Sequence, residues 1–188
     1  VGANKSTVEI INTHTEKFAQ AYFEYDAKKS FGVTKSHLRF SEKPIRSSYY
    51  VKRADFVACH NESYIDQYDM VQEVKPGGVF LLNCRYHGAE LESWLPNRVK
   101  RYLAENKIRF YTIDAVAIAE RLGLGSHTNT VLQAAFFAVT SMVAPEVALE
   151  AMKDAVGVDI PQMLRDVTTG GLVGRSAEKA EKLPEEDK

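Results

Sequence analysis

The sequence of 188 residues is poor in cysteine and contains only Cys59 and Cys84. An iron–sulfur cluster needs about four thiolates, so this chain does not hold one alone. There is no Cys-x-x-Cys pair, and each cysteine ends an apolar run. We therefore expect two buried free thiols, as is usual for a cytosolic protein.

Long apolar runs and an excess of one charge are also lacking. No run approaches the roughly 20 residues of a membrane span, and no signal peptide is recognisable, so we expect a cytoplasmic protein without a membrane segment. The 24 Lys and Arg residues balance 25 Asp and Glu residues, for a net charge of -1. Nucleic-acid-binding proteins usually show a basic excess, so nucleic acid is not an expected partner.

The common catalytic motifs are absent from the sequence. It contains no Gly-x-Ser-x-Gly elbow, no Walker A motif and no His-Glu-x-x-His pair, and its five histidines do not cluster. No residue stands out as a nucleophile or general base. This pattern indicates a binding domain of an enzyme whose chemistry happens elsewhere.

Short apolar runs at 54–59 and 79–84 are typical of strands buried on both faces. A further strand is expected at 108–113, and helices at 64–74, 91–106 and 115–122 alternate with these strands. Such alternation predicts an α/β fold with a Rossmann-like, mainly parallel sheet flanked by helices. Ligands of such sheets lie at the carboxyl ends of the strands.

The segments on either side of this pattern complete the expected architecture. Before it, the sequence predicts a helix at 6–15 and strands at 19–26 and 33–40. After Asn129 the chain becomes helical, with another helix starting at Pro145. We expect a main domain at 1–157, a helical extension at 158–173 and a charged, disordered tail at 174–188.

The N-terminal segment Gly2-Ala3-Asn4-Lys5 directly precedes the first expected helix. Free backbone N–H groups at a helix N-terminus favour a phosphate, and Lys5 adds a mobile charge. An ordinary junction with a solvated lysine explains these residues equally well. Turns of this type usually follow a strand, so a first strand is expected before Val1 and the sequence reads as an excerpt.

A second candidate element is the loop that holds Lys28, Lys29 and Ser30. Two adjacent ammonium groups repel each other, so they gain most when an anion lies between them. The alternative is an exposed basic turn. Together, Gly2, Asn4, Lys5, Lys28, Lys29 and Ser30 suggest a ligand with more than one phosphate, such as a nucleotide or coenzyme A.

Several other polar residues have simpler interpretations. His37 and Arg39 fall on one side of a strand, most simply the solvent-facing side of an edge strand. His60 and Asn61 follow a buried strand, where a capping role for the next helix is favoured over ligand orientation. The turn Gly123-Leu124-Gly125 reads as a helix stop rather than an anion site.

Long ordered runs resemble the gamma-type domain of pyruvate:ferredoxin (flavodoxin) oxidoreductases, within the 2-oxoacid oxidoreductase family. They include Gly-Ala-Asn-Lys, Tyr-Asp-Ala-Lys-Lys-Ser-Phe-Gly-Val-Thr-Lys-Ser-His-Leu-Arg-Phe, Ala-Asp-Phe-Val-Ala-Cys-His-Asn and Lys-Pro-Gly-Gly-Val-Phe-Leu-Leu-Asn-Cys. The resemblance runs from Val1 to about Ala155. Two positions depart from the family pattern: Phe31 replaces a usual glycine, and His127 stands where arginine is common.

The resemblance implies oxidative decarboxylation of a 2-oxoacid, typically pyruvate, to acetyl-CoA, with electrons passing to ferredoxin or flavodoxin. Thiamine diphosphate, magnesium and iron–sulfur clusters belong to other domains of such a homodimeric enzyme, and the gamma-type domain alone is inactive. It helps to bind coenzyme A, so phosphate contacts are expected at Gly2, Asn4, Lys5, Lys28, Lys29 and Ser30. Two alternatives are a packing domain without coenzyme A contacts and a stand-alone nucleotide-binding domain.

Overall fold

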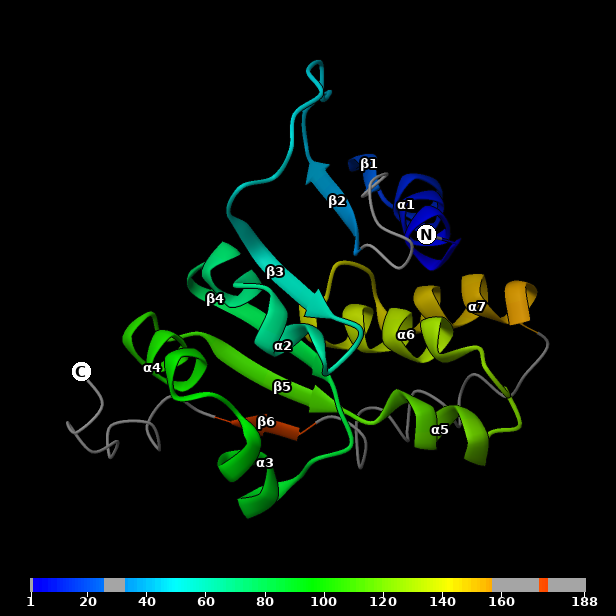
Figure 1. Cartoon of the computed structure of the whole chain (residues 1–188). Helices are drawn as coiled ribbons and strands as arrows, with labels where there is room; N and C mark the ends of the chain where they lie inside the picture. Colours follow the sequence, from blue (N-terminus) through cyan, green and yellow to red (C-terminus); the bar gives the residue numbers. More distant parts are fainter. Residues whose placement is uncertain (1, 26–32, 157–172, 176–188) are drawn as a thin grey trace.

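A computed structural model describes residues 2–25, 33–156 and 173–175. Three layers form its main body, in which helices cover both faces of a four-stranded sheet (Figure 1). The sheet order is β3-β4-β5-β6, with β3, β4 and β5 parallel and β6 antiparallel to β5. The expected α/β class with a mainly parallel sheet and a C-terminal helical part is therefore confirmed.

The strands and helices have the following bounds. The strands are β1 (Phe18–Tyr25), β2 (Thr34–Ser41), β3 (Ala54–Cys59), β4 (Val74–Asn83), β5 (Arg109–Ile113) and β6 (Val173–Arg175). The helices are α1 (Gly2–His14), α2 (Tyr64–Gln67), the 3-10 helix η1 (Met70–Glu73), α3 (Gly88–Trp94), α4 (Asn97–Glu105), α5 (Ala115–Arg121), α6 (Thr128–Thr140) and α7 (Pro145–Val156).

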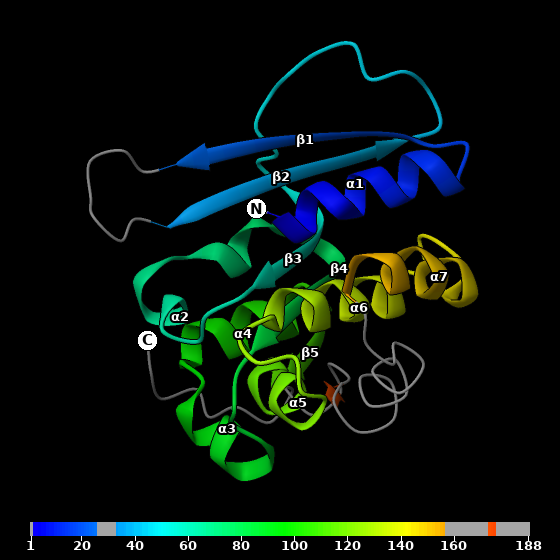
Figure 2. The same ribbon diagram turned by 90° about the vertical axis from the view of Figure 1, so that its right-hand side faces the viewer.

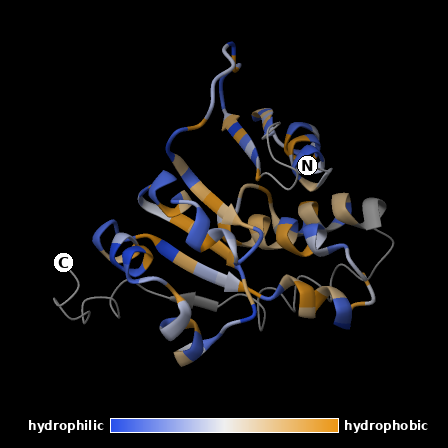
Figure 3. Cartoon of the chain, viewed as in Figure 1, coloured by the Kyte–Doolittle hydropathy of each residue, from blue (hydrophilic) through white to orange (hydrophobic). Residues whose placement is uncertain are grey.

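Two apolar clusters hold these layers together. On one face of the sheet, Leu81 and Ile113 pack with residues of α1, α5, α6 and α7. On the other face, Phe80 and Leu82 pack with residues of α2, α3 and α4. Because both faces of β4 are covered, its run from Val79 to Leu82 is buried and almost wholly apolar, as Figure 3 shows in orange.

The first two strands do not join this sheet. β1 and β2 pair with each other as an antiparallel hairpin, from Phe18 opposite Ser41 to Tyr25 opposite Thr34. Figure 2 shows the hairpin lying alongside α1, above the main body. Its inner face reaches α6, where the rings of Phe40 and Phe136 have centroids 6.2 Å apart. The hairpin is therefore a separate layer attached through α1 and α6.

Several expected boundaries were wrong. The helix expected at 64–74 divides into α2 and η1 because Tyr68 adopts an extended conformation, with φ -135° and ψ 140°. Strand β4 starts at Val74 rather than Val79, since the Lys75–Gly78 segment forms a register shift against β3 instead of a turn. The first helix starts at Gly2, one turn earlier than expected.

The C-terminal part of the chain adds one strand that the sequence did not suggest. Strand β6 pairs with β5, with Val173 opposite Thr112. The remainder of the expected extension and tail, 158–172 and 176–188, lies outside the described residues. The domain boundary at 157 and the disorder of the tail stay predictions.

Strand β3 is the terminal strand of the sheet, so one of its edges has no strand beside it among the described residues. Its sequence nevertheless has the apolar character of a central strand, with Phe56 and Ala58 against one cluster and Val57 and Cys59 against the other. A strand of this type normally has neighbours on both edges. The strand expected before Val1 stays a prediction.

Candidate functional site

A large cavity separates the hairpin from the main body. It has a volume of about 1580 Å³, and both β2 and β3 line it along their whole length. Ala3, Asn4 and Thr7 of α1 contribute to its wall, as do Asn129 and Gln133 of α6. Ordinary ligand pockets occupy roughly 300–1,000 Å³, so this space exceeds the needs of one small molecule.

The N-terminal candidate residues lie in the first turn of α1, not in a loop before it. Two contacts hold this turn: the hydroxyl of Thr7, on the same helix, donates to the carbonyl of Ala3 at 2.9 Å, and the amide of Gln133 on α6 donates to the same carbonyl at 3.3 Å. Asn4 lines the cavity, whereas Gly2 and Lys5 are not among its lining residues. Lys5 Nζ instead lies 5.9 Å from the ring centroid of Phe23 on β1.

The other candidate residues, Lys28, Lys29 and Ser30, lie outside the described residues, as does Phe31. They belong to the connection between Tyr25, the last residue of β1, and Thr34, the first of β2. Their proposed contact with an anion therefore stays a prediction. Of the two expected elements, the structure positions only the one on α1.

The cavity wall carries more basic than acidic side chains. Its basic residues are Lys17, Lys35, Arg39, Lys52, Arg53, Lys75 and Arg109, and its acidic residues are Glu42, Asp55 and Glu73. Two of the acids are neutralised within the wall, because Lys35 lies 2.8 Å from Glu73 and Lys75 lies 3.0 Å from Asp55. The wall therefore keeps a positive surplus, which favours a ligand with negative charge.

Sequence reasoning missed most of this basic lining. Lys52 and Arg53 precede β3, whereas Arg109 begins β5, and no motif relates these positions. The register aligns Phe56, Val79 and Arg109 across β3, β4 and β5, which carries Arg109 toward the same face as Phe56. Only the pairing of the strands brings these cations to one cavity.

His37 and Arg39 share one face of β2, and both also line the cavity. The solvent-facing position expected from the sequence was wrong for His37, because its side chain is only 10% exposed. Both residues instead hold the segment 42–53 that follows β2. We call this segment the arch, because it rises over the hairpin in Figure 2. The guanidinium of Arg39 donates to the carbonyl of Ser47 and to Gln20 Oε1. The backbone N–H of Val51 donates to His37 Nδ1 at 3.1 Å.

Polar side chains also meet at the carboxyl ends of β3 and β4, where parallel sheets often bind ligands. Asn83 connects these ends, because its amide donates to the carbonyl of His60 at 3.0 Å and accepts from the N–H of Ala115 at 3.0 Å. Asn83 thus connects both strand ends to the start of α5.

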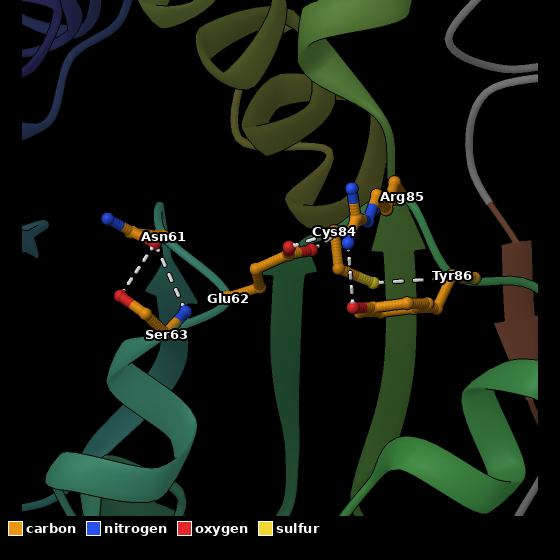
Figure 4. A network of polar contacts seen from close by, with 6 residues as sticks. All are labelled: Asn61, Glu62, Ser63, Cys84, Arg85 and Tyr86. Carbon is orange, nitrogen blue, oxygen red and sulfur yellow. Dashed lines mark hydrogen bonds and ion pairs between the residues drawn. The ribbon is translucent and has the colours of Figure 1, made fainter.

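Figure 4 shows the neighbouring polar network, from Asn61 to Tyr86. Asn61 Oδ1 accepts from the backbone N–H of Ser63 at 3.1 Å, which stabilises the turn before α2. Glu62 accepts from the backbone N–H of Arg85 at 3.3 Å, and Arg85 donates to the hydroxyl of Tyr86 at 3.1 Å. These contacts raise the pKa of Arg85, chiefly through its hydrogen bond to Tyr86. The polar groups of these loops thus bond to one another.

Both cysteines are buried free thiols, in agreement with the sequence. Burial is the main cause that raises the pKa of Cys59 to about 11, and it raises the pKa of Cys84 to about 11 as well. A thiol with so high a pKa is a poor nucleophile at neutral pH. These residues act as apolar packing groups rather than as reactive centres.

Among the described residues, no three His, Cys, Asp or Glu side chains gather in a way that could hold a metal ion. In the same part of the chain, no helix has the length and apolar character required to cross a bilayer.

The comparisons with known proteins decide the family. The family model described as "Pyruvate ferredoxin/flavodoxin oxidoreductase" matches residues 2–163. The chain belongs to this family. It is 53% identical over 156 residues to the pyruvate-flavodoxin oxidoreductase of Klebsiella pneumoniae, a match that covers 83% of this chain and 13% of that protein. The chain therefore corresponds to a small part of a larger oxidoreductase.

Solved structures show the same fold in separate subunits of this enzyme class. The pyruvate oxidoreductase subunit PORC of Thermotoga maritima matches with a TM-score of 0.68 and 18% identity, covering 93% of this chain and 90% of that chain. The gamma subunit of a keto/oxoacid ferredoxin oxidoreductase from Geobacter sulfurreducens matches with a TM-score of 0.62 and 18% identity, covering 87% and 86%. These two likenesses show that the chain has the fold of those subunits.

Proposed function

We propose that this chain is the part of a pyruvate:ferredoxin/flavodoxin oxidoreductase that contacts coenzyme A while the complete enzyme converts pyruvate to acetyl-CoA. The observation that carries the proposal is the basic surplus around the cavity beside α1. Coenzyme A has a pyrophosphate and a 3′-phosphate, so it needs several positive groups in one place. Charge-assisted contacts of this kind contribute about 1.5–3 kcal/mol each.

Two groups of residues have different roles in this proposal. Lys52, Arg53 and Arg109 supply positive charge from the cavity wall, and they form no hydrogen bond or ion pair with another described side chain. Lys28, Lys29 and Ser30 add the phosphate contacts expected from the loop between β1 and β2. Asn4, at the start of α1, offers polar groups to the same cavity.

The other reactants and cofactors belong to the complete enzyme in this proposal. The family implies thiamine diphosphate and iron–sulfur clusters, with magnesium beside the thiamine diphosphate, and ferredoxin or flavodoxin accepts the electrons. The described residues bring no set of metal ligands together, and both thiols are buried. The chain's own contribution is to bind and orient an anionic cosubstrate, in a homodimeric cytoplasmic enzyme.

The test is a calorimetric titration of coenzyme A into the complete enzyme at two salt concentrations. The Lys28→Ala/Lys29→Ala variant should bind at least tenfold more weakly and with a smaller salt dependence, because two phosphate contacts are lost. Lys52→Ala/Arg53→Ala should weaken binding in the same way. A matched control, Lys100→Ala/Lys107→Ala, removes the same charge near α4, outside the cavity lining.

A packing domain without coenzyme A contacts is the alternative. In that case the loop and cavity variants bind coenzyme A as the wild type does, and the complete enzyme melts at a lower temperature. The size of the cavity gives this alternative its own support, since a space of about 1580 Å³ can also accept a protein segment.

A further inference from the structure

Exposed aromatic side chains are concentrated on one side of this chain. Among the described residues, six large hydrophobic side chains are exposed, and five of them lie on the hairpin or the arch. They are Phe18, Tyr22, Tyr25, Tyr49 and Tyr50, with exposures between 45% and 60%. A cluster of exposed apolar groups of this kind usually marks an interaction site.

Four of these rings belong to the outer face of the hairpin and the arch above it. Phe18 and Tyr22 occupy alternate positions on β1, so they share one face. Tyr50 packs edge-on against Tyr22, with ring centroids 5.1 Å apart. The guanidinium of Arg39 stacks on the ring of Tyr49, with its Cζ atom 3.9 Å from the centroid of that ring. Tyrosine and arginine are the residue types that dominate binding energy at protein interfaces.

The arch contains no helix or strand, and contacts with β2 fix it to the hairpin. Arg39 binds the carbonyl of Ser47, and His37 accepts the N–H of Val51 at 3.1 Å. The ring of Tyr50 also contacts His37, with centroids 5.2 Å apart. A surface that is ordered before binding loses less conformational entropy when a partner docks.

The charge of the arch indicates the chemistry of its partner. Residues 42–53 contain four basic residues, Lys43, Arg46, Lys52 and Arg53, and one acidic residue, Glu42. The arch therefore has a formal charge of +3 in a chain whose net charge is -1. Complementary charges across an interface steer association and exclude wrong partners, so the partner surface should be acidic.

We infer that the arch, with Phe18 and Tyr22 beside it, docks onto an acidic protein surface in another part of the same oxidoreductase. The inference rests on the family membership, because the matched region is only 13% of the length of the Klebsiella pneumoniae relative. Most of such an enzyme lies outside this chain and must contact it somewhere. Tyr22, Tyr49 and Tyr50 also line the cavity proposed for coenzyme A, as do Lys52 and Arg53. The inference is therefore tested at Lys43 and Arg46, which do not line it.

The experiment places the photo-crosslinker p-benzoylphenylalanine at position 49 of the complete enzyme, where it keeps an aromatic ring. Irradiation followed by peptide mapping should give a cross-link to an acidic segment outside residues 1–188. In the same enzyme, Lys43→Glu/Arg46→Glu should lower the cross-link yield at least fivefold, because two attractive charges become repulsive. Neither residue lines the cavity, so coenzyme A affinity should stay unchanged.

The control variant Lys100→Glu/Lys107→Glu reverses two charges near α4, which lies far from the arch in Figure 1, and should leave the yield unchanged. Cross-links confined to residues 1–188, in the same or a second copy, would overturn the inference. So would the absence of any cross-link, or its loss when coenzyme A is added. Failure of the coenzyme A titration alone leaves this inference intact.

Discussion

The side-chain amide of Gln133 donates a hydrogen bond to the hydroxyl of Thr7 across 3.0 Å, in a region where both side chains are buried. Through this contact α6 holds the first turn of α1, which borders the cavity. The amide also lies 3.3 Å from the hydroxyl of Ser6. Gln133 is thus a polar residue in a largely apolar helix, and its hydrogen bonds join α6 to α1.

Replacing Gln133 tests how much these hydrogen bonds stabilise the chain. Gln133→Ala should lower the free energy of unfolding by about 1–3 kcal/mol, because buried partners lose their donor. Denaturant unfolding of the purified chain measures the change. In a double-mutant cycle with Thr7→Ala, the coupling should be about 0.5–1.5 kcal/mol. A coupling near zero would show that the two side chains act independently.

Gly78 allows a second stability prediction, because a Cβ atom there has no room. It would lie 2.8 Å from the carbonyl oxygen of Lys75, 2.9 Å from that of Asp55 and 2.7 Å from a methyl of Val74. Backbone oxygens of paired strands cannot move aside cheaply. Gly78→Ala should therefore cost about 1–3 kcal/mol in denaturant unfolding.

Two other glycines, Gly2 and Gly77, supply controls for this change. Gly2 has open space around it and an ordinary φ, so Gly2→Ala should be nearly neutral. Gly77 also has open space, but its φ of +75° should make Gly77→Ala cost about 1–2 kcal/mol through backbone strain. Equal effects at positions 2 and 78 would contradict the steric argument.

The buried thiols predict a pH dependence. Burial raises the pKa of Cys59 from 9.0 to about 11, so the folded protein favours the protonated thiol. The stability from this preference is fully present below about pH 9 and is lost as the pH rises from about 9 to about 11. Cys59→Ala should flatten this part of a curve of melting temperature against pH.

The same burial predicts slow alkylation of both cysteines. At pH 8 the folded chain should react with iodoacetamide far more slowly than the urea-unfolded chain, since little thiolate is present and the sulfur atoms are covered. Mass spectrometry of the labelled protein measures both rates. Rapid labelling of either cysteine in the folded state would disprove the assignment as packing groups.

Variants of Asn83 test whether its side chain joins the ends of β3 and β4 to the start of α5. Asn83→Ala removes its contacts with His60 and Ala115 and should destabilise the purified chain by about 1–2 kcal/mol. Asn83→Asp keeps the acceptor for the N–H of Ala115 but loses the donor to His60. It should therefore protect the amide of Ala115 from hydrogen exchange better than Asn83→Ala does. Equal exchange in the two variants would argue against this arrangement.

The sequence predicted the central strands well because their signal is local. The run at 54–59 has apolar residues on both faces and became β3 with the same bounds. Pro145 likewise marked the start of α7. The single helix expected at 91–106 was wrong, because the chain forms α3 and α4 on either side of Leu95 and Pro96. In these cases the bounds follow from local properties, namely the apolar character of the run itself or the fixed backbone angle of proline.

The remaining features depend on distant contacts. The separation of the β1–β2 hairpin follows from its packing on α1 and α6, and no local pattern distinguishes it from strands of the main sheet. The basic wall needs the register that aligns Arg109 with Phe56, and the arch needs Arg39 and His37 beneath it. Of the residues expected to contact phosphate, Asn4 lines the cavity, whereas Gly2 and Lys5 do not. All the expected phosphate contacts, including those at 28–30, stay predictions.

The open edge of β3 has a practical consequence for anyone who purifies this chain. In the part of the chain that the structure describes, no strand pairs with the outer edge of β3, and an unpaired strand edge is a template for pairing with other chains. At high concentration, separate molecules should associate through this edge, and a short peptide of matching apolar pattern should compete with that association. The effect of such a peptide, rather than solubility alone, reports whether the edge of the sheet is covered.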